Sequence, residues 1–434
     1  MKLSSVTITA IAVIAFSATG VGAEEIKQTE NLQQLVRAAL AGNPELKSSR
    51  ARWQMFVSKA KQASSFEDPM LMFKLQNMMV RQPLAFDKDP QTAKVIGISQ
   101  QLPFWGKRAI RQEIADCEAE SYRWSLEERR LELARMVKEA YYQLWAVDRF
   151  MGVVDKNLKI LEDFLIIAET KYSVGQGVQQ DVYKAGLERS RMLDMQITLA
   201  QQRRSLEASL NFLLSRPGDM PVGTIPDFTM PQLPLSAEEL GRIAAENRPQ
   251  LRSLAMLVAK GEASRRLAEK EFYPDFNLSL EYMQRDAAMN DPGYDMYSVG
   301  MTFNLPLQQE RRRAMLAESV SETGMATEEL NSLKNGISLA INDTLAQLER
   351  RRRLVELYRG GIIPQAEQSL ESAVIGYRVN KVDFLTLLDG RMTLFNYERE
   401  LYESQAEYMM KLAQLEAAVG RELAGASSAG QGAN

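Results

Sequence analysis

The chain has 434 residues but only 25 glycines and 15 prolines, and this scarcity of helix-breaking residues favours a few long elements over several ordinary domains. Charged residues make up 25% of the sequence and the formal net charge is -3, which excludes the strongly basic balance of a nucleic-acid-binding protein. There is no histidine, and Cys117 is the single cysteine, so an internal disulfide is excluded and the usual nucleophilic and metal-hydrolytic sites are not expected. We therefore expect no enzymatic activity, no cofactor and no metal site.

The first 23 residues predict a secretory signal peptide. Lys2 precedes an apolar run over 6–16, and small residues at 21–23 precede Glu24, which are the three regions of such a signal. The apolar run is about half of the ~20 residues that a spanning helix needs. No later segment is long and apolar enough for such a helix, which leaves a soluble exported protein or one that meets the membrane through a β-barrel.

Two related halves make up the rest of the chain. The first repeat covers 24–215 and the second 236–421, a proline-rich linker occupies 216–235, and a flexible tail follows from 422 to 434. Four landmarks recur in the same order, three of them 205 residues apart and the Pro103 pair 203 apart: Leu46 and Leu251, Pro69 and Pro274, Pro103 and Pro306, Tyr172 and Tyr377.

Each half has the same predicted order of elements: short helices, two strands, a long helix and a return helix. In the first half these are helices over 32–41 and 44–66, strands near 70–79 and 93–103, a long helix over 107–172 and a return helix over 179–214. In the second half the strands are near 275–284 and 295–306, the long helix is near 308–377 and the return helix near 383–420.

The strands of the second half alternate most clearly. Apolar residues at Phe276, Leu278, Leu280 and Tyr282 are separated by polar ones, which fits a strand with lipid on one side and water on the other. A strand half-buried on a soluble core is the alternative. Four strands cannot close a barrel in lipid, because an open edge would leave backbone groups unpaired, so a membrane-inserted form requires several chains.

The long helix of the first half carries a coiled-coil seam. From Leu133 to Tyr172 apolar residues recur at alternating steps of four and three, and the return helix continues this spacing, so the two are expected to pack antiparallel. At 1.5 Å per residue the helix reaches about 100 Å, which no compact domain requires. Gly175 is expected to supply a left-handed residue where the helix ends, and Asn380 to do the same in the second half.

Four motifs together resemble the TolC family of outer-membrane efflux proteins: "LPFWGKR", "FYPDFNLSLEY", "YSVGQGVQQDV" and "YRVNKVDFLTLLD". The resemblance implies a mainly α fold with a small β-barrel portion, in which long antiparallel helices form an α-helical barrel across the periplasm. It implies a homotrimer whose chains each give four strands to one 12-stranded barrel in the outer membrane. A periplasmic adaptor and an inner-membrane pump of the resistance-nodulation-division type would be its partners.

The resemblance places the two turns at the tip that closes the tunnel. The family's inward carboxylates correspond to Asp181 and Asp389, and Leu385 lies one turn before Asp389. The second repeat has Thr386 and Val382 where the best-known members have a carboxylate and a basic residue, so their salt-bridge latch is incomplete here. The gate set also includes two tyrosines, and the outward side of the turns matches the family's adaptor contact: Tyr172 and Tyr377 for the gate; Val174, Gly175, Gln176, Val379, Asn380 and Lys381 for the adaptor.

Simpler interpretations of the gate residues stay open. Asp181 would also be favoured by the helix dipole alone, and the two tyrosines could be seam residues only. The expected function is a passive exit duct of a tripartite efflux pump, with heavy-metal cations as the suggested substrate. Ducts for drugs or for type I protein secretion are alternatives, and a soluble periplasmic coiled-coil scaffold is an alternative of another class.

Overall fold

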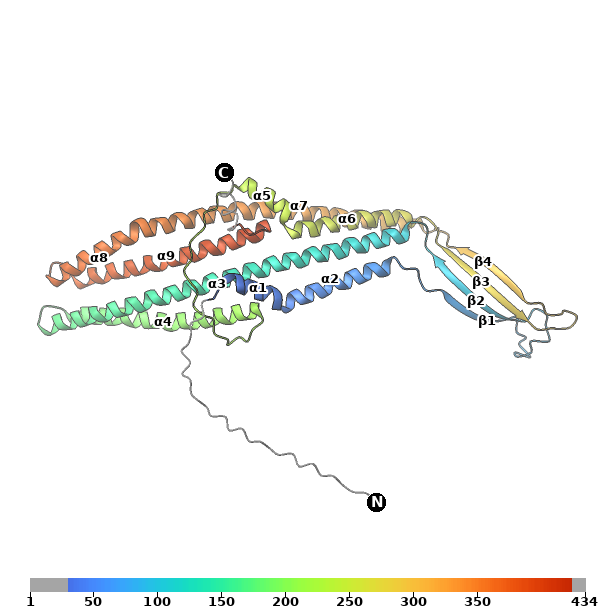
Figure 1. The fold of residues 1–434 in the computed structure, drawn as a ribbon, viewed down its shortest axis with the longest axis horizontal. Coiled ribbons are helices and arrows are strands. Elements are labelled where there is room, and N and C mark those ends of the chain that lie inside the picture. The colour runs from blue at the N-terminus through green and yellow to red at the C-terminus, as the bar shows by residue number, and fades with distance from the viewer. Residues whose placement is uncertain (1–29, 424–434) are drawn as a thin grey trace, which may run out of the picture.

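The computed structural model describes residues 30–423, and in Figure 1 these form a long helical body with a sheet at one end. The predicted signal peptide and all but the first two residues of the predicted tail lie outside the described residues. The first repeat contains α1 (Leu32–Gly42), α2 (Pro44–Ala63), β1 (Met70–Gln76), β2 (Ala93–Leu102), α3 (Lys107–Ser173) and α4 (Gln179–Leu214). The second contains α5 (Ala237–Asn247), α6 (Pro249–Lys270), β3 (Phe276–Arg285), β4 (Met296–Phe303), α7 (Gln309–Leu357), the π-helical turn η1 (Tyr358–Ile362), α8 (Ile363–Arg378) and α9 (Phe384–Val419).

The axis of the first repeat is α3, whose 67 residues correspond to about 100 Å of helix. Leu133, Val137 and Leu144 of its seam are buried, as the heptad spacing predicts, whereas Tyr172 at the end of the seam is 47% exposed. The shorter α2 and α4 lie one after the other along α3 (Figure 1). Within residues 30–423, no helix combines the length and apolar content that crossing a membrane requires.

The long helix of the second repeat runs from 309 to 378, close to the predicted 308–377, but it contains a π-helical turn that the prediction did not include. The backbone widens into η1 at Gly360 and Gly361, and α8 then begins with Pro364 in its first turn. A glycine pair costs helix stability and a proline cannot donate the helical hydrogen bond, so this is where the ladder is weakest. The Tyr358 side chain is buried there, and its hydroxyl donates to Glu400 Oε2 of α9 at 2.7 Å.

The four strands form one antiparallel sheet in the order β1-β2-β3-β4. The register places Leu71, Ile98, Leu280 and Val299 in one row across the sheet, with Phe73, Ile96, Tyr282 and Tyr297 in the next row on the same face. This face, the apolar face, is exposed in every strand. The opposite face carries small and polar residues such as Ser99, Ser279 and Gly300. Both β1 and β4 are edge strands within the chain.

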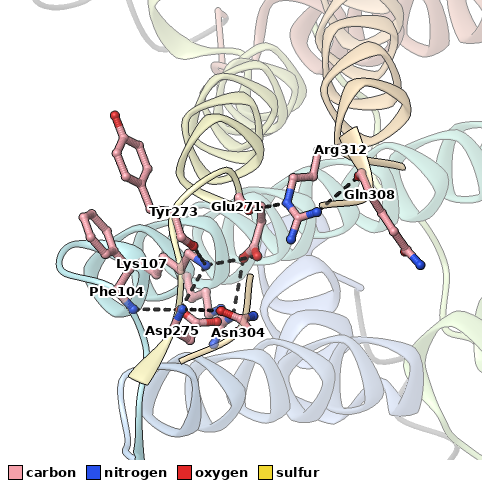
Figure 2. Close-up of polar contacts among 9 residues, drawn as sticks. Phe104, Lys107, Glu271, Tyr273, Asp275, Asn304, Gln308 and Arg312 are labelled. Atoms are coloured by element: carbon pink, nitrogen blue, oxygen red, sulfur yellow. Dashed lines mark hydrogen bonds and ion pairs between the residues drawn. The ribbon is translucent and has the colours of Figure 1, made fainter. Parts of the chain in front are cut away.

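The start of α3 is fixed to the second repeat by a buried lysine (Figure 2). Lys107 is 1% exposed, and its Nζ donates to Glu271 Oε2 at 3.1 Å, to Asp275 Oδ1 at 3.0 Å and to the Tyr273 carbonyl at 3.2 Å. The Phe104 N–H donates to the same Asp275 oxygen at 2.8 Å. A buried cation held by two carboxylates and a carbonyl is fully partnered, so this contact fixes the connection between β2 and α3 to the connection between α6 and β3.

The linker 216–235 crosses between the repeats over the middle of the helical body. Val222 and Ile225 are buried, and Phe228 packs against Trp145 of α3 with ring centroids 4.5 Å apart. The Trp145 Nε1–H donates to Asp227 Oδ1 at 3.3 Å. The Tyr408 hydroxyl of α9 donates to the Pro231 carbonyl at 2.6 Å, so the linker is part of the central core and contacts both hairpins.

Candidate functional site

The two hairpin turns lie next to each other at the end of the body opposite the sheet (Figure 1). Both have the same backbone arrangement: Gly175 has φ +73° and Asn380 φ +61°, as predicted from the sequence. The Gln176 N–H donates to the Lys171 carbonyl, and the Lys381 N–H to the Gly376 carbonyl, each at 2.8 Å. These bonds close both helix ends in the left-handed capping geometry that glycine and asparagine tolerate.

Lys171 connects the turns, although no feature of the sequence sets it apart from other surface lysines. From the last turn of α3, its Nζ donates to the Tyr377 carbonyl at 2.5 Å and to Asn380 Oδ1 at 2.6 Å. The same ammonium lies 4.0 Å from the centroid of the Tyr377 ring. Hydrogen bonds from a charged donor and a cation–π contact both stabilise the pairing of the two turns seen here. We call this contact the lysine clasp.

Two carboxylates from different hairpins interact electrostatically near the clasp. Asp181 lies in the first turn of α4, where burial and the nearby Asp383 carboxylate raise its pKa above the ordinary value of 3.8, partly opposed by Lys171. Asp383 caps the start of α9 by accepting a 2.6 Å hydrogen bond from the Thr386 N–H, and this bond lowers the pKa of Asp383. Two like charges from different hairpins therefore oppose the clasp.

The two turn tyrosines occupy different environments. Tyr377 is 5% exposed and packs against Phe384 with ring centroids 5.6 Å apart, while Tyr172 is half-exposed. Burial and the Asp181 charge raise the pKa of Tyr377, and its hydroxyl has no hydrogen-bond partner among the described residues. Tyr377 is thus a core residue of the clasp, and Tyr172 is a surface residue.

The remaining predicted residues are exposed in the single chain. Leu385 is 43% exposed and Asp389, one turn further along α9, is also exposed; the structure brings neither into contact with Asp181. Val174 and Val379, at the ends of the two long helices, are 61% and 57% exposed. The other residues assigned to the adaptor contact, namely Gly175, Gln176, Asn380 and Lys381, are exposed as well.

A second contact between the hairpins lies deeper in the body and was also missed. Arg391 of α9 is 1% exposed, and its Nε–H donates to Oδ1 of the fully buried Asn157 of α3 at 2.6 Å. Glu398 lies 3.6 Å from the Arg391 guanidinium and accepts from Lys156 at 2.8 Å. Burial lowers the pKa of Arg391, and the nearby Glu398 and Glu367 carboxylates oppose this shift. Arg391 lies seven residues after Phe384, a spacing that marks one face of α9 but does not reveal its partner.

The sequence profile of the outer membrane efflux protein family matches the chain twice, over residues 35–216 and 240–421, with the two matches starting 205 residues apart. The chain belongs to the outer membrane efflux protein family. Efflux proteins of this family are outer-membrane channels rather than enzymes.

Relatives and solved structures of this efflux family agree with that assignment. The chain is 25% identical over 298 residues to the cobalt-zinc-cadmium resistance protein CzcC of Cupriavidus metallidurans, covering 67% of this chain and 68% of CzcC. It is 22% identical over 398 residues to the outer membrane efflux protein BepC of Brucella suis, covering 91% of this chain and 86% of BepC. The outer membrane protein VceC of Vibrio cholerae has the same fold, with a TM-score of 0.76 and 19% identity over 90% of this chain and 96% of VceC. The chain therefore has the expected mainly helical channel fold with a β portion in the outer membrane.

Proposed function

We propose that three copies of this chain form one passive exit duct through the outer membrane. The observation that carries the proposal is the position of the apolar face, which lies at one end of the body, about 100 Å of helix away from the polar turns. A band of exposed Leu, Ile, Val, Phe and Tyr side chains is costly in water and favourable in a bilayer.

The sheet edges support the trimer. Among residues 30–423 of one chain, no strand pairs with the outer side of β1 or of β4. In hydrocarbon their unpaired backbone groups would each cost several kcal/mol, and pairing β4 of one copy with β1 of the next removes this cost. Three copies with four strands each would close a 12-stranded barrel, continuous with an α-helical barrel built from the hairpins.

The hairpin tips would be the gate of this duct. The lysine clasp holds the two turns of a chain together, while the Asp181 and Asp383 charges favour their separation. Threefold symmetry would add rings of Asp181, Asp389 and Leu385 at one mouth, where carboxylates attract cations and leucines exclude water. A periplasmic adaptor contacting the exposed Val174 and Val379 ends of the hairpins, with an inner-membrane pump of the resistance-nodulation-division type behind it, would shift the balance toward opening.

Heavy-metal cations are the substrate that we propose, on the strength of the similarity to the cobalt-zinc-cadmium resistance protein. A strain lacking the gene should become sensitive to cobalt, zinc or cadmium salts, with dyes and detergents as matched challenges. Sensitivity confined to dyes and detergents would indicate a drug duct, and loss of an exported protein would indicate a type I secretion duct.

The assembly is tested separately from the substrate. The mass of the purified protein in detergent should equal three chains after the detergent is subtracted, and the protein should resist extraction from membranes by carbonate. A stable monomer released by carbonate would instead indicate a soluble periplasmic scaffold.

A further inference from the structure

An apolar groove of about 580 Å³ lies where the sheet meets the helices. Its walls come from the end of β2, the start of α3 and the apolar face of β3 and β4, and include Leu102, Phe104, Trp105, Phe276, Leu278 and Met301. Trp105 is 75% exposed and Met301 59%. So large an exposed aromatic surface is unusual unless another molecule covers it.

The groove is held in shape by the buried lysine contact of Figure 2. Because Lys107 fixes Asp275, and Asp275 accepts from the Phe104 N–H, the Phe104 ring stays stacked on Tyr273 with centroids 4.6 Å apart. A preformed groove loses less entropy on binding than one that must form around its ligand.

One end of the groove carries an unneutralised cation, Arg108. Its guanidinium lies 3.5 Å from the centroid of the Phe66 ring, and its Nε–H donates to the Ser64 carbonyl at 3.0 Å. Within residues 30–423 Arg108 has no carboxylate partner, whereas Arg111 lies 3.6 Å from Glu271 and the Lys107 charge is compensated by two carboxylates.

The surroundings of Arg108 also favour an anion. The first turn of α3 contains no acidic residue, although the positive end of a helix dipole normally attracts one. Arg108 therefore adds a positive charge where the dipole is already positive, and it does so beside an open apolar groove.

We propose that this groove binds one anionic glycerophospholipid of the membrane leaflet that faces the helices. The acyl chain lies on the aromatic wall, which continues the apolar face, and the phosphate binds the free edge of the Arg108 guanidinium. Trp105 then lies at the interface between hydrocarbon and headgroups, where amphipathic aromatic residues are favoured. The proposal rests on the outer-membrane location of the family and is independent of the gate and of the exported substrate.

Trp105 is the natural reporter, since the other tryptophans lie on α2 and α3 within the helical body. The full-length mature protein is placed in phosphatidylcholine nanodiscs containing a minor fraction of dibrominated phosphatidylglycerol or, in parallel, dibrominated phosphatidylcholine. Bromine quenches tryptophan fluorescence at short range. The quenching of Trp105 is obtained as the difference in quenched fluorescence between the wild type and Trp105→Phe. We expect phosphatidylglycerol to be enriched about tenfold over phosphatidylcholine next to Trp105, the ratio that a hydrogen bond to a charged group supplies.

The matched variants separate a site from ordinary boundary lipid. Arg108→Gln should abolish the enrichment and Arg108→Lys should retain part of it, whereas Arg129→Gln, which removes a charge from the middle of α3, should leave it unchanged. Each variant must melt near the wild-type temperature, and native mass spectrometry of phosphatidylglycerol adducts provides a second readout. Equal quenching by the two lipids would overturn the proposal, and displacement of the brominated lipid by soluble glycerol phosphate would overturn it in favour of a site for free phosphate.

Discussion

Replacing Lys171 with methionine removes the lysine clasp while keeping most of the apolar stem of the side chain. The clasp consists of two hydrogen bonds from the ammonium, at 2.5 and 2.6 Å, and one contact with the Tyr377 ring at 4.0 Å. Hydrogen bonds to charged groups contribute about 1.5–3 kcal/mol each, but Lys171 is half-exposed to solvent, so we discount each to about 0.5 kcal/mol. The ring contact adds about 0.5 kcal/mol. The closed pairing of the hairpins should therefore lose about 1.5 kcal/mol in each chain, or about a tenfold change in its equilibrium constant.

The assay is single-channel recording in a planar bilayer. Lys171→Met should raise the open probability about tenfold or more, since the change occurs in every chain of the assembly. Lys159→Met is the matched control, because Lys159 is an exposed lysine of α3 with no hydrogen bond or ion pair to the second hairpin among residues 30–423. If Lys171→Met and Lys159→Met both conduct like the wild type, the clasp does not hold the tip closed.

Three further predictions concern the tip and the junction. The pKa of Asp181 is raised in the closed pairing, so protonation of Asp181 stabilises that pairing. Conductance should therefore fall as the pH is lowered from about 7 toward about 4, and Asp181→Asn should conduct less and lose this pH dependence. A wild-type conductance that rises on acidification would contradict the expected direction. Asp389→Ala and Leu385→Ser should raise single-channel conductance if these side chains line the closed mouth, and unchanged conductance would remove them from the gate. Lys107→Met leaves Glu271 and Asp275 without their buried cation and should lower the free energy of unfolding by about 3 kcal/mol, measured by thermal melting in detergent, with exposed Arg313→Met as a control that should melt like the wild type.

Local features of this fold follow directly from sequence patterns. Alternation at Phe276, Leu278 and Leu280 identified the apolar face, because a strand places alternate residues on one side regardless of its neighbours. The turn conformations at Gly175 and Asn380 were also predictable, because each depends on the φ angle of a single residue and not on distant contacts. The strand expected over 70–79 is shorter in the structure, because Asn77 has φ +55° and donates from Nδ2 to the Gln91 carbonyl, which takes the chain out of the ladder after Gln76.

Contacts between the repeats were not predictable in the same way. Tyr172 and Tyr377 are equivalent in the duplicated sequence, yet only Tyr377 is buried, because Lys171 and Phe384 cover its ring. Nothing in the spacing of Arg391 and Asn157 indicates that residues so distant in sequence share a hydrogen bond. Such pairs depend on how the two hairpins pack, and a single sequence contains no record of that packing.

The π-helical turn also explains how two sequence repeats of unequal length can end at the same level. The second repeat is two residues longer than the first between the proline after its last strand and the tyrosine of its turn. This segment runs from Pro306 to Tyr377 in the second repeat and from Pro103 to Tyr172 in the first. A π turn accommodates about one more residue than an α turn over a similar rise, so η1 absorbs part of the excess at Gly360 and Gly361 instead of passing it to α8. Had the excess continued as α-helix, each added residue would have advanced Asn380 by about 1.5 Å and rotated it by about 100° around the axis, away from Lys171. The π-helical turn thus compensates part of the length difference between the repeats, so that the two hairpin turns lie at the same level along the body.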